Sequence, residues 1–400
     1  MTDILDDLNP SQREAVEYLD GPLFVFAGPG TGKTRVTTSK LAYLIMEKGY
    51  RPDEVLALTF SNRAAQEMED RVRKLLPGVS GLQISTFHSF CLEILKDNVL
   101  ELGIDISKGV FKKEYQQAFF LDNMDKFGFQ TIKIPARPAE LARLLQDTIA
   151  RLKQENASPE RLEAYLATKK GKDDQSSAEL ADILRAYKAL EDFKKANGFL
   201  DFGDMQLLTL RLFDSNPEVL NRYQRRLKYL IVDEFQDTDF IQLRMLFKLA
   251  PEGNITVVGD DDQSIYRFRG AYLTNIHEFD EYFDKKGKKP RRVVLDLNYR
   301  CSGNIQTLAT RLIRNNPERA DKEIRTEKGA SLPVQIRGYV NDDQQAADFA
   351  GILKERHQEG MSWESMAVLA LYWIGSTFYS IARRETPVYP ILPKLMFFKS

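Results

Sequence analysis

The sequence has few of the residues that build metal clusters, disulfides or membrane spans. Cys91 and Cys301 are its only cysteines, so thiolates alone cannot supply a zinc or iron–sulfur site, and two distant thiols suit a reducing compartment. The formal net charge is −1, so overall charge neither favours nor excludes a nucleic-acid partner. The first residues lack the basic start and apolar run of a signal peptide, and the apolar stretch from Met366 to Ile374 is too short to cross a bilayer. We therefore expect a cytoplasmic protein without a membrane partner.

Short apolar runs that alternate with helical patterns predict the fold of the first part of the chain. The runs are Leu23 to Ala27, Val55 to Thr59 and Gln83 to Thr86, and the pattern resumes with Tyr229 to Val232 and Ile255 to Val258. Strands that alternate with helices indicate a parallel sheet with helices on both faces. The expected fold class is α/β.

Helical spacing replaces the strand pattern between residues 89 and 197. One apolar face recurs there at helical intervals, through Leu141, Leu144, Leu145, Ile149 and Leu152. We expect an all-helical insertion within the α/β domain.

A further α/β unit is expected after Arg300. Strand candidates lie at 334–336, 367–371 and 388–389, with helical patterns at 344–355 and 377–384. The sequence ends at Ser400, before a unit of the usual domain size is complete. We expect an incomplete second lobe.

The strongest chemical signal is a glycine-rich loop between a predicted strand and a predicted helix. Its residues are Ala27, Gly28, Pro29, Gly30, Thr31, Gly32, Lys33 and Thr34. Glycines let successive backbone N–H groups face phosphates, and the N-terminus of the next helix adds its dipole. Lys33 would contact the β- and γ-phosphates of ATP, and the Thr34 hydroxyl would bind Mg²⁺. A glycine-rich turn without a ligand is the alternative, and the strand–loop–helix context disfavours it.

A phosphate-binding loop of this kind needs a carboxylate at the end of another strand to hold the metal. The apolar run that ends in Asp233 and Glu234 supplies it. Asp233 would bind Mg²⁺ through water, and Glu234 would orient or deprotonate the attacking water. An apolar strand that ends in Asp-Glu is more often structural when it occurs alone, but the pairing with Lys33 and Thr34 favours catalysis.

The run from Val257 to Tyr266 also follows a predicted strand. The Gln263 amide can donate and accept hydrogen bonds, so it could sense the γ-phosphate. Asp260, Asp261 and Asp262 could form a solvated loop or a metal site. The segment that follows alternates aromatic residues with arginines, which suits single-stranded nucleic acid as well as it suits a core aromatic pair with surface arginines.

Seven blocks, in this order, resemble the UvrD/Rep/PcrA family of superfamily 1A DNA helicases. They are Leu8 to Val16, Thr59 to Ala65, Thr86 to Ser89, Leu200 to Asp204, Asp233 to Thr238, Gly259 to Tyr266 and Leu297 to Arg300. The resemblance implies a RecA-like P-loop NTPase domain, called 1A, formed by residues 1–88 and 198–285. It implies a helical domain 1B at 89–197, and the truncated start of a second RecA-like domain, 2A, at 286–400.

The resemblance also implies roles around the nucleotide. Gln12 would read the adenine edge, Tyr299 would stack on the adenine, and Arg300 would contact the γ-phosphate. Arg35, which follows Thr34, would be one of the nucleotide-binding residues. The catalytic set would be Lys33, Glu234, Gln263 and Arg300.

A single-stranded DNA track is implied as well. Its residues would be Phe60, Asn62, His88, Tyr266, Phe268 and Arg269. At Phe268 the family usually has Trp, so weaker base stacking is expected. Nothing from Cys301 to Ser400 resembles motif V or motif VI, and motif VI normally brings a second arginine to the γ-phosphate. We therefore expect the 400-residue chain to bind ATP but to hydrolyse it slowly and not to unwind duplex DNA.

The function that the resemblance implies is ATP-dependent movement from 3′ to 5′ along single-stranded DNA, for DNA repair or replication restart, with DNA junctions as further substrates. One alternative is the helicase subunit of an AddA/RecB-type nuclease–helicase. The other is a non-motor ATP-binding switch protein.

Overall fold

The fold is taken from a computed structural model, which describes residues 4–103, 105–169, 175–264, 274–316, 319–320, 322–370 and 396–398. The chain divides into two compact units, Met1–Ser331 and Leu332–Ser400.

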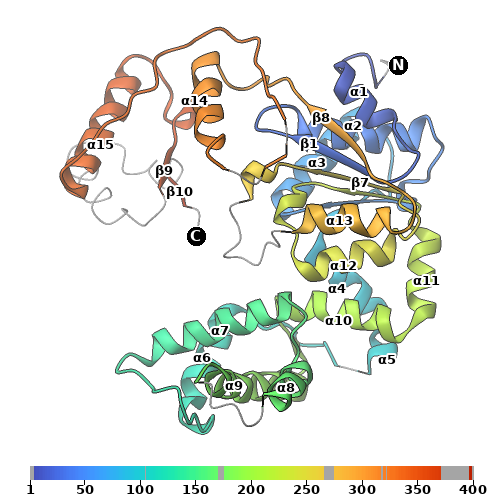
Figure 1. The fold of residues 1–400 in the computed structure, drawn as a ribbon, viewed down its shortest axis with the longest axis vertical. Helices are drawn as coiled ribbons and strands as arrows, with labels where there is room; N and C mark the ends of the chain where they lie inside the picture. Colours follow the sequence, from blue (N-terminus) through green and yellow to red (C-terminus); the bar gives the residue numbers. More distant parts are fainter. Residues whose placement is uncertain are drawn as a thin grey trace. The chain divides into compact units, whose positions relative to one another are not determined.

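A six-stranded sheet forms the centre of the first unit (Figure 1). Its strands are β1 (Leu23–Ala27), β2 (Val55–Thr59), β3 (Gln83–Thr86), β6 (Tyr229–Val232), β7 (Ile255–Gly259) and β8 (Arg291–Leu295). Their order is β3-β2-β6-β7-β1-β8, and every neighbouring pair is parallel. The central strands are buried along their whole length, as expected for a parallel sheet covered on both faces. The predicted α/β class with a parallel sheet is confirmed.

Strand β8 was not among the predicted strands. It begins with two exposed arginines, Arg291 and Arg292, so its sequence does not read as a buried run. It pairs with β1 from Leu23 to Ala27 and forms one edge of the sheet. It lies beyond residue 285, where domain 1A was expected to end, and the domain limits stay a prediction.

Helices cover both faces of the sheet because alternate side chains of each strand point to opposite sides. On one face lie α1 (Pro10–Glu17), α2 (Lys33–Met46) and α3 (Asn62–Leu75). On the other lie α4 (Phe87–Asp97), α10 (Phe202–Ser215), α11 (Pro217–Arg226), α12 (Phe240–Leu249) and α13 (Asn275–Asp284). In β1, Phe24 and Phe26 pack with the second group, whereas Leu23 and Val25 pack with the first.

The expected helical insertion is present between β3 and β6 along the chain (Figure 1), but it also contains two short paired strands and is therefore not all-helical; its limits stay a prediction. Its elements are α5 (Val99–Leu102), β4 (Gly109–Val110), α6 (Lys113–Asn123), α7 (Pro138–Gln154), α8 (Pro159–Thr168), α9 (Gln175–Asn197) and β5 (Phe199–Leu200). Leu141, Leu145 and Ile149 are buried in its own core, and Leu152 packs against them. Leu144 is 61% exposed, so its predicted place on the apolar face is wrong: it lies on the solvent side of α7.

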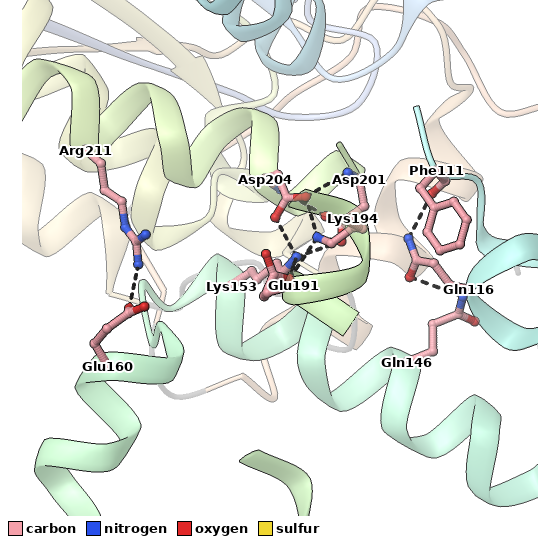
Figure 2. A network of polar contacts seen from close by, with 10 residues as sticks. All are labelled: Phe111, Gln116, Gln146, Lys153, Glu160, Glu191, Lys194, Asp201, Asp204 and Arg211. Atoms are coloured by element: carbon pink, nitrogen blue, oxygen red, sulfur yellow. Dashed lines mark hydrogen bonds and ion pairs between the residues drawn. The ribbon is translucent and has the colours of Figure 1, made fainter. Parts of the chain in front are cut away.

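A buried network of charges joins the insertion to α10 (Figure 2). Lys153 of α7 lies 2.6 Å from both Asp201 Oδ2 and Asp204 Oδ1, and Lys194 of α9 lies 2.7 Å from Asp201 Oδ2. Glu191 Oε1 is 2.7 Å from Lys153 Nζ and 2.8 Å from Lys194 Nζ. Asp201 and Asp204 also form the capping box that begins α10. The two lysines therefore fix the insertion to the first turn of a helix that packs against the sheet.

Among the described residues, two α-helices follow β8, one in each unit. Helix α14 (Gly303–Ile313) belongs to the first unit, and α15 (Asp342–Gln358) belongs to the second, where β9 (Val368–Ala370) pairs in parallel with β10 (Met396–Phe398). The helix predicted at 344–355 and the strand predicted at 367–371 are confirmed. The strand predicted at 334–336 is wrong: these side chains are exposed and have no strand partner among the described residues. The predictions at 377–384 and 388–389 lie outside the described residues. No described helix has the length and apolar character of a membrane span.

Candidate functional site

Most of the predicted site residues that the structure describes gather at the carboxyl ends of the parallel strands, which meet on one side of the sheet. The glycine-rich loop follows β1, the acidic pair follows β6, and the turn with Gln263 follows β7. Phe60 follows β2, and His88 lies in the helix that follows β3. The strand order therefore places the acidic pair between Phe60 and His88 on one side and the Gln263 turn and the glycine-rich loop on the other.

The glycine-rich loop leaves β1 at Ala27 and enters α2 at Lys33. Gly30 and Gly32 have φ angles of +76° and +93°, which favour glycine. A Cβ on Gly30 would lie 2.5 Å from Arg300 Cβ, so the loop also needs glycine for close approach. No side chain caps the N-terminus of α2. Its first backbone N–H groups are therefore available to an anion such as phosphate.

A cluster of polar side chains lies at the α1 side of this loop. Gln12 is buried, and its Nε2 donates to Thr31 O at 3.0 Å. Its Oε1 accepts from Asn9 N at 3.2 Å, which closes the capping box of α1. Asn9 Nδ2 in turn donates to the Tyr299 hydroxyl at 2.9 Å, and the Tyr299 ring is exposed. Gln12 and Tyr299, both predicted to recognise adenine, thus lie beside the same loop.

Arg300 is held against the glycine-rich loop by its backbone. Tyr299 N donates to Gly30 O at 2.9 Å, and the buried Asn298 side chain accepts from Arg300 N at 2.7 Å and from Cys301 N at 3.0 Å. The Arg300 side chain is exposed. The backbone of the arginine predicted to contact the γ-phosphate is therefore fixed in a turn next to Gly30.

Lys33 and Glu234 are in direct contact across the site. Lys33 Nζ lies 2.8 Å from Glu234 Oε2, which also accepts from Gln236 Nε2 at 2.8 Å. Glu234 has a φ angle of +51°, in the left-handed region that non-glycine residues rarely adopt. Such backbone strain often accompanies a functional site and persists because the surrounding contacts fix it.

Asp233 is buried directly behind this pair. Burial raises the pKa of its carboxyl to about 6, the Glu234 charge adds to the shift, and Lys33 opposes it. Asp233 Oδ1 is buried and has no hydrogen-bond partner among the described residues. A buried, unpartnered carboxylate oxygen is costly unless a cation or a proton meets it. This donor set fits a hard cation such as Mg²⁺.

The turn after β7 links Gln263 to the acidic pair. Gln263 Nε2 donates to Asp260 Oδ2 at 2.6 Å, and Asp260 N donates to Gln236 Oε1 at 3.0 Å. Gln236 therefore bridges Glu234 to the turn that carries Gln263. The three aspartates, predicted as either a solvated loop or a metal site, lie close enough together to hold a metal ion, and Lys322 pairs with all three carboxylates.

The residues predicted to contact DNA lie on the other side of the acidic pair. Phe60 is 46% exposed, and Phe60 and His88 line a cavity of about 110 Å³ together with Asp233 and Glu234. Burial lowers the pKa of His88, which favours the neutral ring. Its neighbour is Phe202, an exposed aromatic whose ring lies edge-on at 5.6 Å.

The other predicted site residues are less closely tied to this centre. Asn62 begins α3, and its Oδ1 accepts from Ser89 Oγ at 3.5 Å. Arg35 is exposed and pairs with Asp7 at 3.3 Å. Tyr266, Phe268 and Arg269 lie outside the described residues.

Comparison with known proteins identifies the family. The model of the UvrD/REP helicase N-terminal domain matches residues 8–284. The chain belongs to the UvrD/REP helicase family. It is 36% identical over 361 residues to the ATP-dependent DNA helicase PcrA of Bacillus subtilis, covering 89% of this chain and 46% of that protein. It is 33% identical over 371 residues to the PcrA proteins of Staphylococcus epidermidis and Staphylococcus aureus, covering 92% of this chain and 48% of theirs. The chain spans about half the length of these curated relatives.

Four residues of this UvrD/REP family chain contribute to the site but were given no role from the sequence. Gln236, Asn298 and Phe202 lie within or beside the blocks that carry the family resemblance, so their position was a usable signal. Lys322 had no such signal, because its partners lie about 60 residues earlier in the chain.

Proposed function

We propose that this chain binds ATP with Mg²⁺ and single-stranded DNA as the N-terminal part of an ATP-dependent DNA helicase. The observation that carries the proposal is the contact between Lys33 and Glu234, at 2.8 Å, beside the cavity that Phe60 and His88 line. The whole protein would move 3′ to 5′ along DNA in repair or replication restart, act on DNA junctions, and work in the cytoplasm.

ATP would bind along the glycine-rich loop, with the turn that carries Arg300 packed beside that loop. The α2 N–H groups and Lys33 would bind the β- and γ-phosphates, and Gln12 and Tyr299 would bind the adenine. Mg²⁺, when bound by Asp233 and Thr34, would neutralise charge on the phosphates.

Glu234 would change partner when the triphosphate binds. Phosphate oxygens compete with its carboxylate for the Lys33 ammonium, because both are anions that bind the same donor. A released Glu234 carboxylate can orient a water molecule and accept its proton, while Gln236 still holds the carboxylate in place. Gln263 and Arg300 would contact the γ-phosphate from the other side.

DNA binding would act on the same acidic pair. Phe60 and His88 share a cavity with Asp233 and Glu234, so a nucleotide base that displaces either ring also changes the surroundings of the carboxylates. This gives a physical route by which single-stranded DNA could alter the rate of hydrolysis.

Two alternatives remain distinct from this proposal. A subunit of an AddA/RecB-type nuclease–helicase would share the same motor residues and add a nuclease domain. A non-motor switch would bind ATP but respond to no DNA. The shared cavity favours the motor over the switch, because a switch has no need of exposed aromatics beside its acidic pair.

Two binding measurements test the proposal. A fluorescent ATP analogue with Mg²⁺ should bind the chain, and Lys33→Ala should abolish binding. A labelled oligothymidine should bind, and Phe60→Ala should weaken that binding while ATP binding stays within about twofold, since stacking contributes roughly 1–3 kcal/mol per base. An oligothymidine that binds Phe60→Ala and the unchanged chain equally would exclude the proposed DNA track.

A further inference from the structure

The turn that carries Asp260, Asp261 and Asp262 holds a cation of its own. The Lys322 side chain is 0% exposed, and its Nζ lies 2.5 Å from Asp260 Oδ1 and 3.1 Å from Asp262 Oδ2. It also pairs with Asp261. Burial disfavours its ammonium, but Asp260 and the hydrogen bonds outweigh burial and raise the pKa of Lys322. The lysine is therefore charged and surrounded by all three carboxylates.

A second cation completes the arrangement. Arg319 donates to both oxygens of Asp262, at 3.2 Å from Nε and 3.0 Å from Nη2. The backbone N of Ala320 donates to Asp261 Oδ2 at 2.6 Å. Two cations and one N–H group thus face three carboxylates, and every carboxylate has a partner. All of these donors come from the short stretch that follows α14.

The same stretch lies against the glycine-rich loop. A Cβ on Gly28 would lie 2.0 Å from Ile324 Cδ1 and 3.9 Å from Asp260 Oδ2. Asp260 Oδ2 also accepts from Gln263 Nε2 at 2.6 Å. The carboxylates therefore stand beside the loop proposed to bind phosphates, and one of them fixes the glutamine proposed to sense the γ-phosphate.

Three carboxylates next to a triphosphate would oppose its binding. Like charges at short range repel strongly where water is partly excluded, and salt screens them only weakly there. A buried counter-ion removes that repulsion and fixes the turn at the same time. We propose that Lys322 is a positioning residue of the ATP site, which neutralises the Asp260–Asp262 turn so that the turn holds Gln263 beside a bound triphosphate. This inference rests on the proposed ATP site.

Lys322→Met tests the inference in the full chain. Removing the ammonium leaves Asp260 and Asp261 without a cation, while Arg319 still pairs with Asp262, so affinity for Mg-ATP should fall by about tenfold or more. ADP, with one phosphate fewer, should lose less, and adenosine should lose nothing. Lys288→Met is the matched control, because Lys288 pairs with the exposed Glu252 at 2.7 Å and should change no affinity. Melting curves check that each variant is folded.

Charge rescue separates neutralisation from a merely structural role. Lys322→Met combined with Asp261→Asn and Asp262→Asn should restore Mg-ATP affinity to within about threefold of the unchanged chain, since two of the three negative charges are then removed and the Arg319 charge remains near Asp260. If Lys322→Met does not fold, the double variant Asp261→Asn/Asp262→Asn, which keeps Lys322, still tests the inference. It should bind Mg-ATP several-fold more tightly than the unchanged chain.

The outcomes separate this inference from the proposed function. If Lys322→Met binds Mg-ATP as tightly as the unchanged chain, the inference is overturned. It is also overturned if Lys322→Met binds weakly and the Asn substitutions do not restore affinity, because Lys322 would then act as a direct phosphate ligand. Failure of the unchanged chain to bind Mg-ATP in a Lys33-dependent manner would overturn the proposed function itself.

Discussion

Lys33 Nζ and Glu234 Oε2 lie 2.8 Å apart, although 201 residues separate them in sequence. The contact joins the first turn of α2 to the end of β6. One residue is the proposed ligand of the phosphates, and the other is the proposed base. Because the two residues are paired, binding of phosphate to Lys33 would release the Glu234 carboxylate.

Glu234→Gln tests that exchange. The amide cannot deprotonate water, so hydrolysis of ATP should fall roughly 10²- to 10⁴-fold. Affinity for Mg-ATP should stay equal or rise, because Lys33 no longer has a charged competitor. Single-turnover hydrolysis and equilibrium binding on the same preparation measure both. Hydrolysis at the unchanged rate would remove Glu234 from the catalytic role.

Gly30→Ala tests the close approach of the loop to Arg300. A Cβ at Gly30 would meet Asn298 Oδ1 and Arg300 Cβ, each at 2.5 Å. The substitution should lower affinity for Mg-ATP by more than about tenfold, since displacement of Arg300 and strain at positive φ act together.

Gly78→Ala is the control for strain alone. Gly78 has a φ of +85°, but an added Cβ would meet nothing within 4 Å. It should cost about 1 kcal/mol of stability and leave nucleotide binding unchanged. Equal loss of affinity in both glycine variants would contradict the proposed contact between the loop and Arg300.

Lys153→Met tests the buried joint between the helical insertion and α10. It leaves Asp201 and Asp204 with one lysine fewer in a buried site, so the free energy of unfolding should fall by about 3–5 kcal/mol. Lys188→Met in α9 removes an exposed ion pair with Glu163 and should change the free energy of unfolding by less than about 1 kcal/mol. Urea unfolding compares the two. A similar small effect for both would mean that the buried network does not stabilise the joint.

Asp239→Asn tests a pH dependence of stability. Burial raises the pKa of the Asp239 carboxyl to about 7, whereas the unfolded chain has an ordinary value near 4. The folded protein therefore holds a proton that the unfolded chain has lost, and the stabilisation from this group disappears as pH rises through 7. Asn can still accept from Gln242 N, as Asp239 does at 2.9 Å, without ionising.

The Asn variant should accordingly melt a few degrees above the unchanged chain at pH 8, with a smaller difference at pH 5. Thermal melts at the two pH values give the comparison. A difference that is the same at both values would show that Asp239 titrates normally.

Local sequence signals were enough to predict the parts of the site that a strand and its following turn define. The loop from Ala27 to Thr34 and the pair Asp233 and Glu234 each follow a short apolar run, and each occurs where expected. Strand β8 was not predicted because it begins with Arg291 and Arg292. These exposed residues interrupt the apolar pattern, which is possible in an edge strand because its side chains are only partly buried.

Contacts between distant segments could not be predicted in this way. The pairing of Lys322 with Asp260 depends on how the chain after α14 returns to the sheet, and nothing in the local pattern around either residue encodes that return. The strand expected at 334–336 is absent for a related reason: a run as short as Val334, Gln335 and Ile336 forms a strand only if a neighbouring strand pairs with it.

In the proposed function, the same ends of the parallel strands bind both ATP and single-stranded DNA. The most direct measurement is the rate of ATP hydrolysis by the chain with and without oligothymidine, with Lys33→Ala as the blank. We expect a slow, Lys33-dependent rate that oligothymidine increases and that Phe60→Ala makes less responsive to DNA. A rate that oligothymidine leaves unchanged, with intact binding of ATP, would contradict it and favour a nucleotide switch.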